Sequence, residues 1–169
     1  MSTRPIRVLF VCLGNICRSP TVEGVFTAFV KQQGMAGEIE IDSCGTSDWH
    51  VGSPPDARAI RAAASRGYTI AQLRARQIRI SDFDECDFIL AMDRDNLLEL
   101  KTVCPPHYQG YMGLFLQIAP DLGRDELPDP YYGNEHAFEQ VLDLAEAASE
   151  KLLALVLRRR GWGSGSPPK

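Results

Sequence analysis

The sequence lacks any long apolar run. No uninterrupted apolar stretch in its 169 residues approaches the roughly 18 residues that a membrane-spanning helix needs. Residues 1–5 also lack the charged and then apolar pattern of a secretory signal. We therefore expect a protein without membrane insertion that is located in the cytoplasm.

An excess of positive charge is also missing. Lys and Arg number 18 against 22 Asp and Glu, for a net charge of −4. This balance gives no reason to expect nucleic acid or an anionic membrane surface as a partner. An anionic ligand would have to be attracted by a local positive site.

Cysteines are few, and they are not arranged as a disulfide framework or a metal site. The five cysteines are Cys12, Cys17, Cys44, Cys86 and Cys104. An odd number without a secretory signal favours reduced thiols. Cys104 and His107 have a spacing that suits a metal, but no second pair accompanies them, so we predict no metal and no cofactor.

A strand, a loop and a helix are predicted at the start of the chain. Residues 8–11 are uninterrupted apolar, as in a parallel strand buried on both faces, and Cys12 follows at its carboxyl end. Ser19 suits a helix N-cap and Pro20 suits the first helical position. The intervening loop then surrounds the positive end of a helix, where free N–H groups favour an anion.

The residue types in this loop fit phosphoryl transfer. A helix N-terminus and the cation of Arg18 both stabilise a thiolate, the nucleophilic form of Cys12. The planar fork of Arg18 can hold two phosphoryl oxygens, and Ser19 can donate a hydrogen bond to the thiolate. Gly14 and Asn15 tolerate the positive φ that lets successive N–H groups converge. The alternative is a structural cysteine beside a solvated arginine.

A second candidate lies in the Asp- and Pro-rich stretch 119–133. Pro128 and Pro130 flank Asp129 and bias it away from the helical conformation, so that its carboxyl projects. Such a carboxyl can protonate a departing oxygen. A solvated acidic loop is the alternative.

Both stretches resemble a known family. Residues 11–20 (Val-Cys-Leu-Gly-Asn-Ile-Cys-Arg-Ser-Pro) resemble the active-site loop of low-molecular-weight protein tyrosine phosphatases, and residues 129–133 (Asp-Pro-Tyr-Tyr-Gly) resemble that family's acid loop. The resemblance covers about residues 6–157. It implies hydrolysis of phosphotyrosine monoesters in a protein or peptide through a phosphocysteine, with inorganic phosphate as product.

The resemblance also implies roles for individual residues. Cys12, Arg18 and Asp129 would be catalytic, as nucleophile, phosphate ligand and general acid. The phosphate-binding positions would be Leu13, Gly14, Asn15, Ile16, Cys17 and Arg18. Support would come from Ser19, Asn15 and Ser43, and the substrate ring would lie between Trp49, Tyr131 and Leu13. Leu73 stands where many members carry a His that is hydrogen-bonded into the loop network.

The position of Cys17 suggests that it protects Cys12 from oxidation. It follows the nucleophile by five residues in the same loop, so oxidised Cys12 could condense with it and escape irreversible oxidation. The alternative is that Cys17 is only a small residue that fills the loop.

For the whole chain we predict one three-layer α/β domain over residues 1–160, followed by a flexible tail over 161–169. The sheet would have four parallel strands in the order 2-1-3-4 with helices on both faces. The strands after the first would be residues 39–43, 87–92 and 111–117. The helices would be residues 20–33, 56–66, 94–100 capped by Asp93, and 135–160 capped by Asn134.

Three other functions remain open at this point. An arsenate reductase on the same scaffold relays oxidation to two further cysteines, and Cys86 has no close partner in the sequence. A phosphoarginine phosphatase of the family carries Thr where this chain has Ile16. An inert phosphotyrosine-binding module would be expected to have lost Cys12 or Asp129, and both are present.

Overall fold

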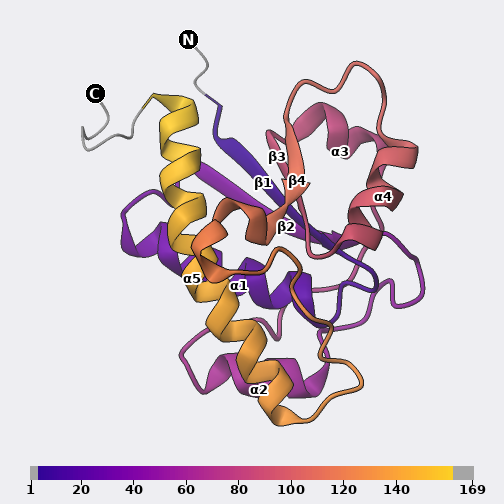
Figure 1. The fold of residues 1–169 in the computed structure, drawn as a ribbon, viewed down its shortest axis with the longest axis vertical. Coiled ribbons are helices and arrows are strands. Elements are labelled where there is room, and N and C mark those ends of the chain that lie inside the picture. The colour runs from indigo at the N-terminus through magenta and orange to yellow at the C-terminus, as the bar shows by residue number, and fades with distance from the viewer. Residues whose placement is uncertain (1–3, 162–169) are drawn as a thin grey trace.

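Four parallel strands form the sheet, in the order β2-β1-β3-β4, in a computed structural model that describes residues 4–161 (Figure 1). The order of elements is β1 (Ile6–Cys12), α1 (Arg18–Gln32), β2 (Ile39–Gly45), α2 (Ala57–Ala64), α3 (Ile80–Glu85), β3 (Phe88–Ala91), α4 (Arg94–Val103), β4 (Tyr111–Leu114), the 3-10 turns η1 (Phe115–Ile118) and η2 (Pro120–Leu122), and α5 (Glu135–Arg160). The predicted strand order is confirmed.

The central strand β1 is buried on both faces because it pairs with β2 on one side and β3 on the other. Its alternate side chains enter two separate cores. Val8 and Phe10 face α1 and α5, whereas Leu9 and Val11 face the α3 and α4 side. The predicted three-layer arrangement with helices on both faces is therefore confirmed.

The core under α1 and α5 is organised around Phe10. Its ring packs edge-on against Phe26 of α1 at 5.7 Å and against Phe115 of η1 at 5.5 Å between centroids. All three rings are fully buried. This packing holds α1 against the end of β1, so the loop between them has two rigid supports.

The short helix α2 lies outside this sandwich, against α1 and α5 (Figure 1). Ala59 and Ala63 present small side chains to a third apolar cluster that includes Cys17 and Phe138. The Asp56 carboxylate caps α2 by accepting a hydrogen bond from Arg58 N. The start of α2 is thereby placed between the loop after β1 and the start of α5.

Several predicted boundaries are wrong. Helix α1 starts at Arg18, so Ser19 is inside the first turn and is not the N-cap; its hydroxyl is used by the loop instead. Strand β4 ends at Leu114, where the chain turns into η1. Helix α3 was not predicted from the sequence, because six residues are too few to show a helical period.

Both predicted caps of the later helices are confirmed. Asp93 accepts from Asn96 N at the start of α4, and Asn134 accepts from Ala137 N at the start of α5. The tail predicted for 161–169 lies outside the described residues except for Gly161, which ends α5 in the left-handed conformation. No helix within residues 4–161 combines the length and apolar character needed to cross a membrane.

Candidate active site

The loop between β1 and α1 is bent by one left-handed residue. Asn15 has φ of 58°, and it is the one non-glycine residue with positive φ in the described part of the chain. Behind the loop, a Cβ on Gly45 would lie 2.6 Å from Leu13 O, so only glycine fits at the end of β2. Thr46 N and Ser47 N donate to Cys12 O and Leu13 O at 2.9 and 3.0 Å. The loop is therefore fixed from behind.

The Asn15 side chain holds this bend with three hydrogen bonds. Its Oδ1 accepts from Arg76 N at 3.0 Å, and its Nδ2 donates to Ser19 Oγ at 2.7 Å and to Ser43 Oγ at 3.0 Å. Every donor and acceptor of the amide has a partner, and the side chain is buried. The predicted support residues Asn15, Ser19 and Ser43 thus form one network behind the loop.

The backbone amides of the loop are free to bind an anion. Asn15 N donates to Cys12 Sγ at 3.2 Å, but within residues 4–161 no partner accepts from the N–H groups of Leu13, Gly14, Ile16, Cys17 or Arg18. These groups belong to a loop that closes on the N-terminus of α1, where the helix dipole adds positive potential. The arrangement suits a tetrahedral oxyanion.

Cys12 lies at the base of the loop with two hydrogen-bond partners. Besides Asn15 N, Ser19 Oγ is 3.1 Å from Sγ. Because Ser19 Oγ already accepts from Asn15, its one proton can go to Sγ or to Cys44 O at 3.4 Å. A negative sulfur attracts that proton more strongly than a carbonyl does, so the Ser19 hydroxyl can donate to an attacking Cys12 sulfur.

The Arg18 guanidinium is buried, with 4% exposure, and is held by one carboxylate and one carbonyl. Nη1 donates to Asp93 Oδ2 at 2.6 Å and to Leu127 O at 3.1 Å, while Nη2 is 3.8 Å from Asp129 Oδ2. Burial alone would lower the pKa of Arg18, but the negative groups at Cys12, Asp93 and Asp129 raise it above its usual value. Arg18 is therefore a fixed cation.

Asp93 has a second role that sequence reasoning missed. One oxygen caps α4 and the other orients Arg18. The capping pattern is visible in the sequence, whereas the contact with Arg18 joins residues 75 positions apart. No pattern of neighbouring residues in the sequence indicates such a contact.

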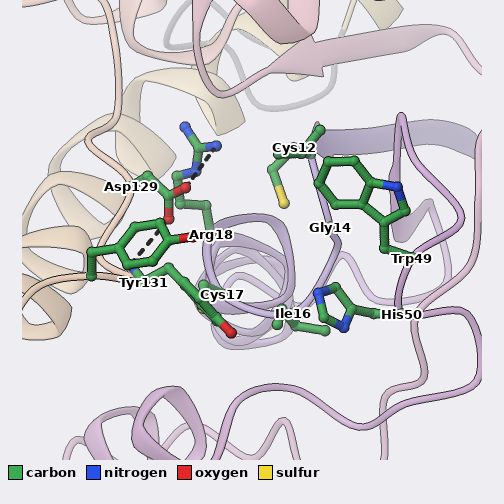
Figure 2. Close-up of a pocket in the computed structure, with 11 residues that line it drawn as sticks. Cys12, Gly14, Ile16, Cys17, Arg18, Trp49, His50, Asp129 and Tyr131 are labelled. Carbon is green, nitrogen blue, oxygen red and sulfur yellow. Dashed lines mark hydrogen bonds and ion pairs between the residues drawn. The ribbon is translucent and has the colours of Figure 1, made fainter.

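Asp129 reaches the same pocket from the loop before α5. Its Oδ1 accepts from Tyr131 N at 3.1 Å, and its Oδ2 faces Arg18. The side chain is 45% exposed, so solvent and substrate can reach it. In Figure 2, Asp129 and Tyr131 lie on one side of the pocket and Trp49 and His50 on the other, with the Cys12 sulfur between them.

A cavity of about 180 Å³ joins these groups. It is lined by Cys12, Leu13, Gly14, Ile16, Cys17, Arg18, Trp49, His50, Asp129, Tyr131 and Tyr132. Trp49 is 71% exposed, which suits the mouth of a pocket and not a core position. The structure thus brings the three proposed ring walls to one cavity and adds His50, which packs against Gly14.

Cys17 lies at the N-cap position of α1 and lines this cavity, although it is buried. Burial, followed by the negative charges of Asp56 and Cys12, raises the pKa of Cys17 to about 12. It is therefore protonated at neutral pH. The structure places Cys17 and Cys12 on the same cavity, and the redox role of Cys17 stays a prediction.

Glu23 extends the support network and was also missed from the sequence. Its Oε1 accepts from Ser43 Oγ at 2.6 Å, and Ser43 in turn accepts from Asn15. Burial raises the pKa of Glu23 to about 7; nearby Asp42 acts in the same direction, and Ser43 and Arg76 oppose it. Leu73 packs in the apolar cluster of Cys17 and takes no part in the network.

Comparisons with known proteins agree on one family. The family model described as low molecular weight phosphotyrosine protein phosphatase matches residues 7–161. A low molecular weight phosphotyrosine protein phosphatase of Schizosaccharomyces pombe is 42% identical over 80% of this chain and 87% of its own. A relative of Streptomyces coelicolor is named as a low molecular weight protein-tyrosine-phosphatase. It is 40% identical over 89% of this chain and 93% of its own.

A solved structure shares the fold as well. The crystal structure of a protein tyrosine phosphatase from Entamoeba histolytica superposes with a TM-score of 0.86 at 37% identity. The match covers 92% of this chain and 98% of that one. Sequence and fold thus point to the same family over nearly the whole chain.

The Glu23 carboxyl predicts a pH-dependent stability. Its pKa rises from 4.5 to about 7 in the fold, so the native state binds the proton more tightly than the unfolded state. The associated stability is fully present below about pH 4.5 and is lost as the pH rises through about 7, for a total of ~3 kcal/mol. Glu23→Gln removes this dependence. The free energy of unfolding of the variant should therefore increase relative to that of the wild type as the pH rises.

Urea unfolding of both proteins from about pH 4.5 to pH 8.5 measures this difference. Glu150→Gln, at an exposed position on α5, is the matched control and should follow the wild type. Parallel stability curves for wild type and Glu23→Gln would show that the buried carboxyl titrates normally.

Proposed function

The chain belongs to the low molecular weight phosphotyrosine protein phosphatase family and is a cysteine-dependent protein-tyrosine phosphatase, and from this premise we propose how its own residues carry out the hydrolysis. The observation that carries the proposal is that Cys12 and the fixed Arg18 guanidinium line one cavity, in a loop whose N–H groups at residues 13, 14 and 16–18 have no partner within residues 4–161. A nucleophile and an oxyanion site are thereby combined in one loop.

In the first step, the Cys12 thiolate attacks phosphorus and the bond to the phenolic oxygen breaks. The free amides of residues 13, 14 and 16–18 and the Arg18 fork hold the three equatorial oxygens, on which the charge of the transition state is spread. Asp129 gives its proton to the departing oxygen, so that a neutral phenol leaves. The product on the protein is phosphocysteine.

In the second step, Asp129 has lost its proton and acts as a base. It takes a proton from water, and the water oxygen attacks phosphorus and displaces the Cys12 thiolate. Inorganic phosphate leaves, and Asp129 is protonated again. The 45% exposure of Asp129 supports this double role, because water reaches the carboxyl directly.

The walls of the cavity support an aryl substrate. Leu13, Trp49 and Tyr131 offer an apolar leucine and two aromatic faces above the phosphate site, which suits a phenyl ring on its phosphate ester. We propose a phosphotyrosine-containing protein or peptide as the substrate. All five cysteines are free thiols, in keeping with a reducing compartment, so we propose a cytoplasmic location.

The structure offers no support for the arsenate or phosphoarginine alternatives. Cys86 and Cys104 belong to the core on the α3 and α4 face, and neither lines the cavity around Cys12. Neither cysteine is therefore placed in the cavity to receive oxidation directly from Cys12. Ile16, an apolar residue, lines the pocket at the position where the family resemblance implies Thr for phosphoarginine specificity.

Replacement of Asp129 by Ala tests the proposed acid. We expect kcat/KM for a phosphotyrosine peptide to fall roughly 10²- to 10⁴-fold, because the phenolate must then leave unprotonated. An aryl phosphate whose phenol is strongly acidic should lose much less. Steady-state assays of both substrates with wild type, Asp129→Ala and the control Asp121→Ala decide this; equal losses on the two substrates would rule out Asp129 as the acid.

Peroxide treatment tests Cys17. Peroxide converts the Cys12 thiolate into a sulfenic acid, and the Cys17 thiol then condenses with it to give a disulfide and water. We expect peptide mapping to find the Cys12–Cys17 disulfide and dithiothreitol to restore activity. Cys17→Ala should be inactivated permanently at the same dose, whereas Cys104→Ala should recover. Full recovery of Cys17→Ala would contradict a protective role.

A further inference from the structure

Arg58 is held rigidly at the start of α2. Its Nε donates to Asp56 Oδ1 at 3.0 Å and its Nη2 donates to Asp56 Oδ2 at 2.9 Å, a two-pronged pairing of guanidinium and carboxylate. The guanidinium also lies over the ring of Phe138 of α5, 4.7 Å from its centroid. A side chain with four rotatable bonds is thereby reduced to one geometry.

The remaining donors of Arg58 reach the loop that carries Asp129. Nη2 donates to Tyr131 O at 3.0 Å, and Nη1 donates to Gly133 O at 3.4 Å. The guanidinium lies 5.6 Å from the centroid of the Tyr131 ring. One side chain therefore contacts two carbonyls and one ring of the acid loop.

After Leu127, few other hydrogen bonds attach this loop to the fold. Within residues 4–161, the hydrogen bonds from Arg58 are the only ones that join residues 130–133 to another part of the fold. Tyr131 N bonds to Asp129 and Gly133 N bonds to Pro130 O, which are contacts inside the loop. The backbone of residues 131–133 is thus attached to the fold by hydrogen bonds from Arg58, while the Asp129 carboxyl also lies 3.8 Å from Arg18.

The partner of Arg58 is itself joined to the phosphate loop. Asp56 N donates to Ile16 O at 2.8 Å. A continuous path runs from Ile16 through Asp56 and Arg58 to the backbone of Tyr131. It links the loop that holds the nucleophile to the loop that holds the proposed acid.

We propose that Arg58 is a positioning residue for general acid catalysis: paired with Asp56, it fixes the backbone of Tyr131 and Gly133, and thereby the Asp129 carboxyl, against the phosphate loop. Arg58 touches no reacting atom in this scheme. It acts through Asp129, and the proposal rests on the proposed role of that residue. Since proton transfer depends steeply on distance, a loosened acid loop weakens leaving-group protonation while phosphate binding is preserved.

The test is a double-mutant cycle with Arg58→Met and Asp129→Ala, measured as kcat/KM. Methionine keeps an unbranched apolar chain beside Phe138 but removes every donor. We expect Arg58→Met to lose ~10- to 10²-fold on a phosphotyrosine peptide and much less on an aryl phosphate with a strongly acidic phenol. In the Asp129→Ala background, Arg58→Met should change kcat/KM by a factor of only about one, because the acid through which Arg58 acts has been removed.

Three further measurements separate positioning from general stability. The inhibition constant of inorganic phosphate should be unchanged in Arg58→Met, because the cradle is intact. Arg61→Met, at an exposed position of the same helix, should behave as wild type. Arg58→Lys keeps the charge without the fork and should fall between wild type and Arg58→Met; it replaces Arg58→Met in the cycle if thermal melting shows that variant to be unfolded.

A loss of equal size on the two substrates, a loss that persists in the Asp129→Ala background, or no loss at all would overturn the proposal. Failure of the proposed function looks different. In that case the wild type itself would show no turnover of the activated aryl phosphate, and Asp129→Ala would show no dependence on the leaving group.

Discussion

The left-handed bend at Asn15 is the constraint on which the site depends. A non-glycine residue in this conformation costs free energy, and it persists because three hydrogen bonds hold its buried amide and none of its polar atoms is left over. A left-handed residue allows successive N–H groups to face one centre, and Asn15 N itself donates to Cys12 Sγ. The remainder of the support, from Gly45 behind the loop to Glu23 behind Ser43, keeps that bend in place.

The electrostatics of the pocket follow from this geometry. Free amides and the N-terminus of α1 supply partial positive charge, and Arg18 supplies a full one. Asp93 fixes Arg18 from behind, so the guanidinium is already oriented when a phosphoryl group arrives. Such pre-organisation stabilises the transition state without a rearrangement of the protein. In the proposed mechanism, Asp129 supplies the proton that this positive site lacks.

Sequence patterns predicted what is local and missed what is long-range. The apolar strand 8–11, the caps Asp93 and Asn134 and the strand order each had a signal within a few residues or in the family resemblance. The prediction of Ser19 as an N-cap is wrong because the capping rule considers only neighbouring residues. In the fold, the Ser19 hydroxyl accepts a hydrogen bond from the Asn15 side chain instead. The contacts of Glu23 with Ser43 and of Arg58 with Tyr131 span 20 and 73 positions, and only the fold brings them together.

The central claim is that the reaction passes through a phosphate ester of Cys12, and trapping that species tests it most directly. Wild-type protein is mixed with an aryl phosphate, quenched in acid within milliseconds and digested, and the peptide that contains Cys12 is weighed by mass spectrometry, with Cys12→Ser as the control. We predict a wild-type peptide heavier by one phosphoryl group, with the added mass on the Cys12 sulfur, and no turnover by Cys12→Ser. Turnover without any phosphorylated Cys12, or continued hydrolysis by Cys12→Ser, would contradict the mechanism.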